Sequence, residues 1–123
     1  MQVFLVEDSP LVRDRLISLL GSVPGAQVQG CASEAQEAIR DILARRPDVV
    51  VLDLKLANGS GFDVLRAVHA QAPAIDFYML SNFASEPYRR LAGKLGARDF
   101  FDKSSEFERV REVIARRAAT NPS

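Results

Sequence analysis

Five short apolar runs alternate along the chain with longer stretches in which apolar residues recur at helical spacing. This rhythm repeats without a linker or a low-complexity segment, and it is typical of five consecutive βα units. The first and third runs are the most continuously apolar, as expected of central parallel strands that are covered on both faces. The expected strands are 3–6, 27–31, 48–52, 75–80 and 98–101.

Helix-start signals lie in the stretches between these runs. Ser9 and Pro10 suit the cap and the first turn of a helix. A short fourth helix, less apolar than the others, is expected over 86–94. The last helix is expected to begin at Ser105, because Ser105 and Glu108 have the spacing of a capping box. Each unit is therefore expected to supply one strand and one helix.

Right-handed crossovers limit five βα units to a doubly wound sheet or a fragment of a barrel, and five units cannot close an eight-unit barrel. We therefore predict an α/β fold with a doubly wound, flavodoxin-like sheet of five parallel strands, in the order 2-1-3-4-5, and five flanking helices. Ligands of such sheets bind outside the carboxyl ends of the strands, beside the switch point between the first and third strands. One domain is expected over residues 1–119, with 120–123 as a frayed C-terminal tail.

The 123-residue chain has 16 basic and 16 acidic residues. A chain without net charge lacks the positive field that favours nucleic acids or anionic membranes, so we expect neither as a direct partner. The first residues do not resemble a signal peptide, and every apolar run is far shorter than the about 20 residues that cross a bilayer. A cytoplasmic location is therefore expected. The single cysteine, Cys31, has apolar neighbours and is expected to be buried and unreactive.

Polar residues follow the ends of four expected strands. They are Glu7 and Asp8 after the first strand, Asp53 after the third, Ser81 after the fourth and Lys103 after the fifth. The first and third strands are neighbours, so three carboxylates converge in one crevice. Like charges so close together cannot all stay ionised unless a cation joins them, and Mg²⁺ suits carboxylate and phosphate oxygens. The sequence therefore predicts a Mg²⁺ site at this edge of the sheet.

Lys103 and Ser81 add groups that suit a phosphoryl group. The ammonium group of Lys103 can bind one phosphoryl oxygen, and the hydroxyl of Ser81 can donate to another. With a cation, an ammonium and a hydroxyl around one carboxylate, the expected chemistry is nucleophilic attack by Asp53 on phosphorus. The product would be an aspartyl phosphate.

In these residues the chain resembles the receiver domain of response regulators, the phosphorylated proteins of two-component signalling. The resemblance covers nearly the whole chain and implies the same strand order. It rests on the acidic pair Glu7-Asp8, the segment 53–56 with Gly61 eight residues after Asp53, then Ser81, Gly96-Ala97 and Lys103. At 123 residues, the chain is expected to be a single receiver domain without an output domain.

The resemblance also implies a role for each site residue. Asp53 would be the phosphoacceptor, assisted by Lys103 and Ser81. The implied metal ligands are Asp53, Asp8, Glu7 through a water molecule, and the backbone carbonyl of Lys55. Ser81 and Phe100 would form a switch pair, in which the hydroxyl moves toward the phosphate and the ring turns inward. This change would remodel the face formed by the fourth helix, the fifth strand and the fifth helix.

The implied partners are a histidine kinase or a histidine phosphotransfer protein as phosphoryl donor, and a downstream protein target. A homodimer is possible. The resemblance implies a signalling domain, not an enzyme, whose only chemistry is its own phosphorylation and dephosphorylation.

Two other function classes are open to a sheet of this kind. A phosphohydrolase similar to haloacid dehalogenases would have a second acid two places after the nucleophile, where this chain has Lys55. A flavodoxin would cradle the flavin phosphate after the first strand, where Glu7 and Asp8 would repel it.

Four positions depart from the family pattern: Ala57, Asn82, Phe100 and Ser104. Ser104 stands where the family usually has a proline after the lysine. Because a cis bond before a residue other than proline costs about 3 to 4 kcal/mol, we expect a trans bond between Lys103 and Ser104. Ser104 or Ser105 would then cap the last helix. The basic cluster of Arg89, Arg90 and Lys94 is expected to be a solvated helix face.

Overall fold

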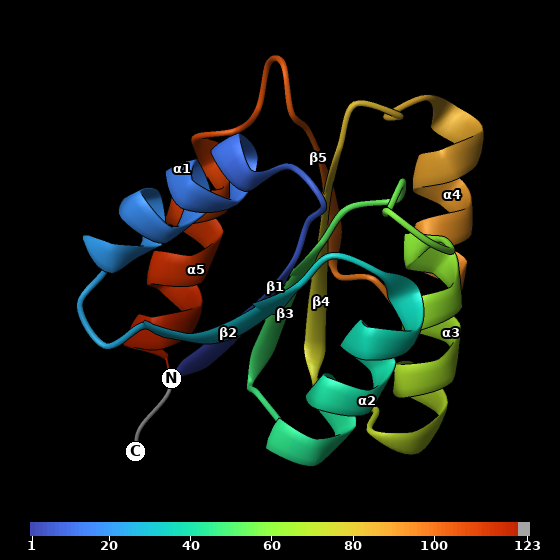
Figure 1. Cartoon of the computed structure of the whole chain (residues 1–123). Coiled ribbons are helices and arrows are strands. Elements are labelled where there is room, and N and C mark those ends of the chain that lie inside the picture. The colour runs from blue at the N-terminus through green and yellow to red at the C-terminus, as the bar shows by residue number, and fades with distance from the viewer. Residues whose placement is uncertain (121–123) are drawn as a thin grey trace.

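A computed structural model describes residues 1–120 of the chain. It has one sheet of five parallel strands in the order β2-β1-β3-β4-β5, flanked by five helices. Figure 1 shows α1 and α5 on one face of the sheet and α2, α3 and α4 on the other. The predicted fold class and strand order are therefore confirmed.

Strands and helices alternate strictly along the chain. The strands are β1 (Gln2–Val6), β2 (Gln27–Ala32), β3 (Val49–Leu52), β4 (Asp76–Ser81) and β5 (Asp99–Asp102). The helices are α1 (Pro10–Gly21), α2 (Ala35–Arg45), α3 (Gly61–Gln71), α4 (Glu86–Lys94) and α5 (Arg109–Ala119).

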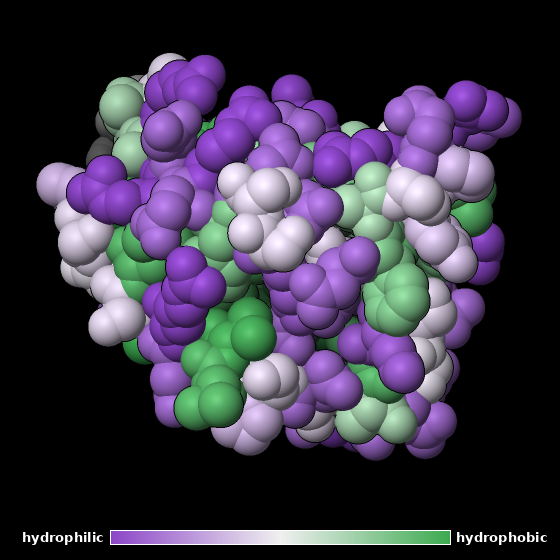
Figure 2. Space-filling view, turned by 90° about the horizontal axis from the view of Figure 1, so that it is seen from above, coloured by the Kyte–Doolittle hydropathy of each residue, from purple (hydrophilic) through white to green (hydrophobic). Residues whose placement is uncertain are grey.

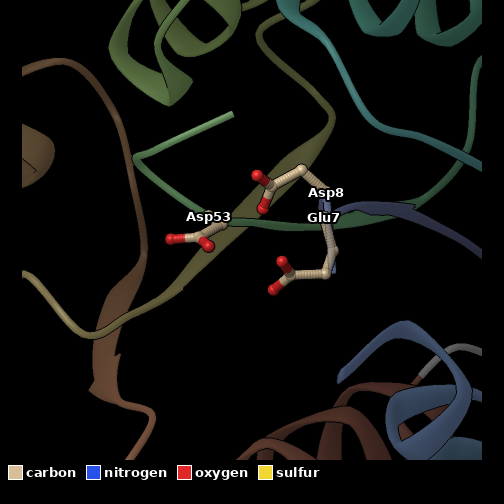
Figure 3. Close-up of side chains that lie close together, drawn as sticks. All are labelled: Glu7, Asp8 and Asp53. Atoms are coloured by element: carbon tan, nitrogen blue, oxygen red, sulfur yellow. The ribbon is translucent and has the colours of Figure 1, made fainter. Parts of the chain in front are cut away.

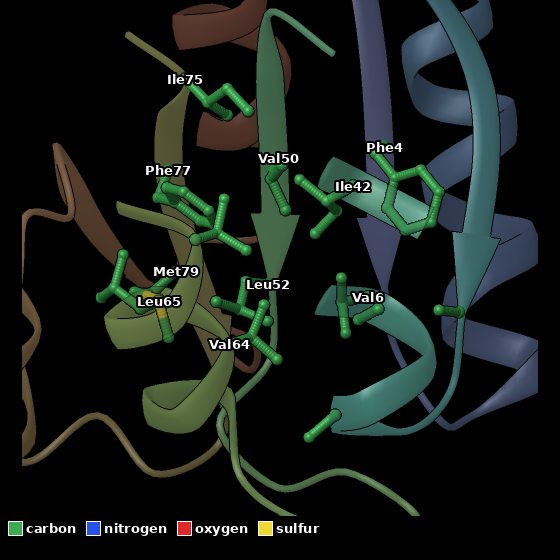
Figure 4. Close-up of a cluster of buried hydrophobic side chains, with 14 of the residues drawn as sticks. Phe4, Val6, Ile42, Val50, Leu52, Val64, Leu65, Ile75, Phe77 and Met79 are labelled. Carbon is green, nitrogen blue, oxygen red and sulfur yellow. The ribbon is translucent and has the colours of Figure 1, made fainter. Parts of the chain in front are cut away.

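The sheet separates two hydrophobic clusters. Successive side chains of a strand point to opposite faces, so Phe4 and Val6 of β1 pack toward α2 and α3, whereas Val3 and Leu5 pack toward α1 and α5. Figure 4 shows the first cluster, with Phe4, Val6 and Ile42 among its labelled side chains. Because both faces are covered, central strands must be apolar at every position, which explains the continuous runs in the sequence.

Two helix starts were correctly predicted, those of α1 and α4. Ser9 caps α1 by accepting a hydrogen bond from the backbone N–H of Val12, and Pro10 is the first residue of that helix. Helix α3 begins at Gly61, where Ser60 and Asp63 form a capping box. Helix α4 has the bounds that the sequence predicts. The caps of α1 and α3 are contacts between residues that are close in sequence.

The predicted start of the last helix is wrong. Helix α5 begins at Arg109, and its N-cap, Glu108, makes no side-chain capping bond. Ser104 does not cap this helix either, because its N–H and hydroxyl both donate to Asp102 Oδ1, over 2.8 Å and 2.6 Å. The bond between Lys103 and Ser104 is trans, as expected.

Two burial predictions are also wrong. Cys31 is exposed, because it lies on β2, an edge strand of the sheet. Arg90 and Lys94 are exposed on α4, but Arg89 is only half exposed and binds three other segments of the chain.

Among residues 1–120, no helix is long and apolar enough to span a membrane. Of the expected tail, Thr120 donates its N–H to Arg116, and residues 121–123 lie outside the described part.

Candidate functional site

The carboxyl ends of the strands surround a cavity of about 260 Å³. Its lining includes Glu7, Asp8, Asp53, Lys55 and Lys103. Figure 2 looks down on this edge of the molecule, where most of the surface is hydrophilic and hydrophobic side chains form separate patches. The polar residues that the sequence places after the strands therefore do meet at one site, with the exception of Ser81.

Three carboxylates converge in this cavity (Figure 3). Hydrogen bonds extend the strand pairing to the site, because Asp53 donates its N–H to Val6 and Glu7 donates its N–H to Ala32, each over 3.0 Å. Carboxylate oxygens of Glu7, Asp8 and Asp53 lie within 4.8 Å of one another. Glu7 and Asp53 are buried, with exposed fractions of 2% and 5%, whereas Asp8 is exposed to solvent.

Lys103 binds two of these carboxylates. Its Nζ atom lies 2.6 Å from Glu7 Oε1 and 2.6 Å from Asp53 Oδ2. Burial lowers the pKa of Lys103, but the hydrogen bonds to Asp53 and Glu7 outweigh this effect, and the pKa is raised above its ordinary value. The side chain therefore stays an ammonium ion at neutral pH and neutralises one of the three carboxylate charges.

Burial raises the pKa of Glu7, and the negative charge of Asp53 adds to this effect. Hydrogen bonds from Lys103 and from the backbone N–H of Ser9 act in the opposite direction without cancelling it. The Ser9 N–H donates to Glu7 Oε2 over 3.0 Å, so both oxygens of Glu7 have partners within the protein. Glu7 is therefore oriented before any ligand binds.

The Asp53 carboxylate is also oriented by its neighbours. Its Oδ1 atom accepts the N–H of Leu54 over 2.7 Å, while Oδ2 binds Lys103. The loop after Asp53 packs closely on the start of α3, where Gly61 donates its N–H to the carbonyl oxygen of Leu54. A Cβ atom at Gly61 would overlap the carbonyl oxygen of Asp53. This close approach explains why a glycine follows Asp53 at this distance.

The arrangement suits a divalent cation. Three carboxylates and one ammonium leave two negative charges in a partly buried space, and Mg²⁺ typically takes carboxylate oxygens together with water and phosphate oxygens. Lys55 also lines the cavity, and its backbone carbonyl is the further ligand that the resemblance implies. The residues present therefore fit the predicted metal.

Ser81 and Phe100 are not among the residues that line the cavity. Ser81 is the last residue of β4, whereas the sequence predicted that it would follow the strand. It is fully buried, and its hydroxyl oxygen accepts the N–H of Phe83 over 3.1 Å. The Phe100 ring is buried in the core beside α4. Lys103 connects to this region, because its N–H donates to the carbonyl oxygen of Ser81 over 3.1 Å.

Sequence reasoning missed two features of the site. Phe83 lines the cavity with its ring half exposed, and its position two residues after Ser81 was the available signal. The ion pair between Arg89 and Glu106, at 3.0 Å, joins α4 to the loop that carries Lys103. No local spacing indicates this pair, since the two residues are 17 positions apart.

Known proteins similar to this chain include a DNA-binding transcriptional activator and protein-glutamate methylesterases. One is the DNA-binding transcriptional activator DevR/DosR of Mycobacterium tuberculosis, 37% identical over 86 residues, which cover 70% of this chain and 40% of that protein. Another is protein-glutamate methylesterase/protein-glutamine glutaminase 3 of Geobacter sulfurreducens, 34% identical over 95% of this chain and 33% of that protein. The chain thus spans well under half the length of these relatives, and the methylesterase name describes the longer protein.

Solved structures show the same fold. The response regulator domain of Thermotoga maritima CheB matches with a TM-score of 0.84 and 26% identity, over 97% of this chain and 93% of that one. A two-component response regulator of the LuxR family from Aurantimonas sp. matches with a TM-score of 0.88 and 28% identity, over 96% and 84%.

The family model described as response regulator receiver domain matches residues 3–115, which is nearly all of the chain and includes every residue of the carboxylate site. The fold is that of a signalling domain, and the acidic cluster lies where the receiver fold has its acidic pocket. The chain therefore belongs to the response regulator receiver domain family, the phosphoacceptor domains of two-component signalling.

Proposed function

We propose that Asp53 is the phosphoacceptor of this receiver domain. The donor is a phosphohistidine of a histidine kinase or a histidine phosphotransfer protein, and the phosphorylated domain acts on a downstream protein target. The observation that carries this assignment is the Lys103 ammonium, which lies 2.6 Å from both Asp53 and Glu7 in the crevice at the switch point of the sheet.

The proposed reaction needs only one nucleophile from the chain. A carboxylate oxygen of Asp53 attacks the phosphorus of the phosphohistidine, and an O–P bond forms as the N–P bond breaks. The electron pair of the broken bond stays on the imidazole nitrogen of the donor. Asp53 is suited to this role because its carboxylate is held by Leu54 and Lys103 and has access to the cavity.

Lys103 and the acidic residues have separate tasks. The Lys103 ammonium binds a phosphoryl oxygen once Asp53 is no longer its partner, so positive charge stays at the site throughout. The residues that would hold Mg²⁺ are Asp53, Asp8, Glu7 through a water molecule, and the carbonyl group of Lys55. Bound Mg²⁺ supplies charge that neutralises the phosphoryl oxygens.

Ser81 and Phe100 are proposed as the switch. The Ser81 hydroxyl leaves the N–H of Phe83 and donates to a phosphoryl oxygen, and the Phe100 ring repacks in the space beside β4. The ring has no hydroxyl group, so its contribution comes from packing alone. The altered face is the one formed by α4, β5 and α5, where the downstream partner or a second copy of the chain would bind.

Self-catalysed phosphorylation and dephosphorylation are the only chemistry that we propose for this chain. The phosphohydrolase alternative remains disfavoured by Lys55 and the flavodoxin alternative by the acidic pair. Three expectations from the sequence remain predictions. They are a cytoplasmic location, the absence of direct binding to nucleic acid, and a domain that spans residues 1–119.

The test is intact mass spectrometry after incubation with acetyl phosphate and Mg²⁺. One phosphoryl group should be added to the wild-type chain as acetate leaves, and none should be added to Asp53→Asn or in the presence of a chelator. The Asp53→Asn variant should melt as a folded protein, because the amide keeps the shape of the carboxylate. Undiminished labelling of this variant would show that another residue is the acceptor.

A further inference from the structure

Arg89 connects three segments of the chain, two of which contribute residues to the cavity of the proposed site. From its position on α4, its Nε donates to the carbonyl oxygen of Ala84 over 2.7 Å, and Nη1 donates to that of Phe100 over 2.8 Å. Its Nη2 donates to Glu106 Oε1 over 3.0 Å. These partners belong to the loop after β4, to the edge strand β5 and to the loop after β5. One side chain therefore holds both loops against the open edge of the sheet.

The neighbouring arginine shows that this arrangement is specific. Arg90 is 65% exposed, and its one ion pair within residues 1–120 is with Glu86, at 3.8 Å and in the same helix. Arg89 is 32% exposed, and its guanidinium lies 5.3 Å from the centre of the buried Phe100 ring. Exposed pairs within one helix contribute little to stability, whereas a half-buried arginine with three partners restrains all of them.

Glu106 passes this restraint to the residues on either side of Lys103. Its Oε1 atom also accepts the N–H of Asp102 over 3.0 Å, and Asp102 in turn accepts both the N–H and the hydroxyl of Ser104. Lys103 lies between these two hydrogen-bonded residues. In a loop that lacks the rigidity of a proline after the lysine, these bonds fix the backbone from which the Lys103 side chain reaches Asp53.

We propose that Arg89 and Glu106 are positioning residues that hold the Lys103 ammonium beside Asp53, where it can bind a phosphoryl oxygen during phosphoryl transfer. The inference rests on the proposed function of Asp53 and Lys103. A displacement on the order of 1 Å at a reacting group can slow a reaction by up to about 100-fold. Loss of either positioning residue should therefore slow phosphorylation although neither touches the phosphoryl group.

The experiment compares rate constants for phosphorylation by acetyl phosphate at saturating Mg²⁺, at a temperature where thermal melts show every variant to be folded. Arg89→Ala and Glu106→Ala are expected to react roughly tenfold more slowly than the wild type. Arg90→Ala is the matched control and should react at the wild-type rate. Glu106→Gln keeps the acceptor oxygen for Asp102 and Arg89, so it should recover most of the rate that Glu106→Ala loses.

A second comparison separates positioning of Lys103 from general loosening of the domain. In a Lys103→Ala background, Arg89→Ala should cause no further loss of rate, because the residue through which it acts is already gone. Arg89→Ala that reacts as fast as the wild type would overturn the proposal, and so would an equal loss of rate with and without Lys103. A wild-type chain that is not labelled would overturn the function of Asp53 itself, and the positioning role with it.

Discussion

The Nζ atom of Lys103 lies 2.6 Å from Asp53 Oδ2, a contact that joins residues 50 positions apart. The same nitrogen lies 2.6 Å from Glu7 Oε1. Lys103 thus neutralises part of the negative charge that would attract a divalent cation. The ammonium and the cation are attracted by the same carboxylates, so the positive charge of each weakens the binding of the other.

Lys103→Met should therefore bind Mg²⁺ more tightly than the wild type while being phosphorylated more slowly. Removing the ammonium leaves the buried Glu7 and Asp53 without a cation, and a gain of at least about tenfold in affinity, or about 1.4 kcal/mol, is expected. Calorimetric titration with Mg²⁺ measures the affinity, and intact mass measures phosphorylation. Lys94→Met, an exposed change on α4, is the control. Unchanged or weaker Mg²⁺ binding by Lys103→Met would contradict the competition.

Asp8→Asn should weaken Mg²⁺ binding more than Glu7→Gln. Both oxygens of Glu7 are engaged by Ser9 and Lys103, whereas Asp8 is exposed in the cavity and is expected to contact the metal directly. Titration of both variants measures the difference. Asp14→Asn, an exposed acid on α1, controls for the loss of one negative charge. The reverse order would mean that Glu7 is the direct ligand.

The sequence was sufficient for most of the fold because the periodic patterns are local. Continuous apolar runs such as 49–52 identify buried parallel strands, and a cap such as Ser9 acts within one turn of its own helix. The same reasoning placed the acidic residues correctly, since parallel strands end at one edge of the sheet. These features depend on residue type and short spacing, which the sequence displays directly.

The errors arise where distant residues decide the local structure. Helix α5 begins at Arg109 and not at Ser105, and the preceding loop is held by Glu106, whose partner Arg89 lies on another helix. Cys31 is exposed because β2 is an edge strand, a property of the strand order and not of the neighbours of Cys31 in sequence. Short-range patterns contain no information on such contacts.

Gly61→Ala should destabilise the domain and slow its phosphorylation. A Cβ atom at this position would overlap the carbonyl oxygen of Asp53, so the loop or the helix must shift, which typically costs about 1–3 kcal/mol. Chemical denaturation measures the loss. Gly93→Ala is a matched control, because it lies within α4 with nothing within 4 Å of its Cβ position. It should be neutral or stabilise by up to about 1 kcal/mol. Equal stability of the two variants would show that the close approach at Gly61 is not needed.

The stabilisation that Mg²⁺ provides should decrease as the pH falls toward the ordinary pKa of a glutamate, 4.5. A metal that binds only the folded chain raises its melting temperature, with about 2.7 kcal/mol of stabilisation at a concentration 100 times Kd. Burial raises the pKa of Glu7 in the folded chain, so folding favours the protonated form. The raised pKa of Glu7 therefore contributes to the stability of the folded chain, and this contribution is fully present below pH 4.5, the ordinary pKa. It is lost as the pH rises through the pKa of Glu7 in the folded chain. Binding of Mg²⁺ requires the opposite form, the carboxylate, and its effect therefore grows over the same pH range.

Thermal melts with and without saturating Mg²⁺ between about pH 8 and pH 5 test this dependence. The rise in melting temperature that Mg²⁺ causes in the wild type should be largest at the highest pH. As the pH is lowered, this rise should begin to shrink while the pH is still above the ordinary pKa of glutamate, because the raised pKa of Glu7 lets it bind a proton at higher pH in the folded chain. Glu7→Gln removes the titrating group at an almost unchanged shape, so its smaller increment should vary less over this range. If the wild type and Glu7→Gln show the same pH profile, the dependence comes from another carboxylate, and the buried Glu7 does not control the binding of the metal.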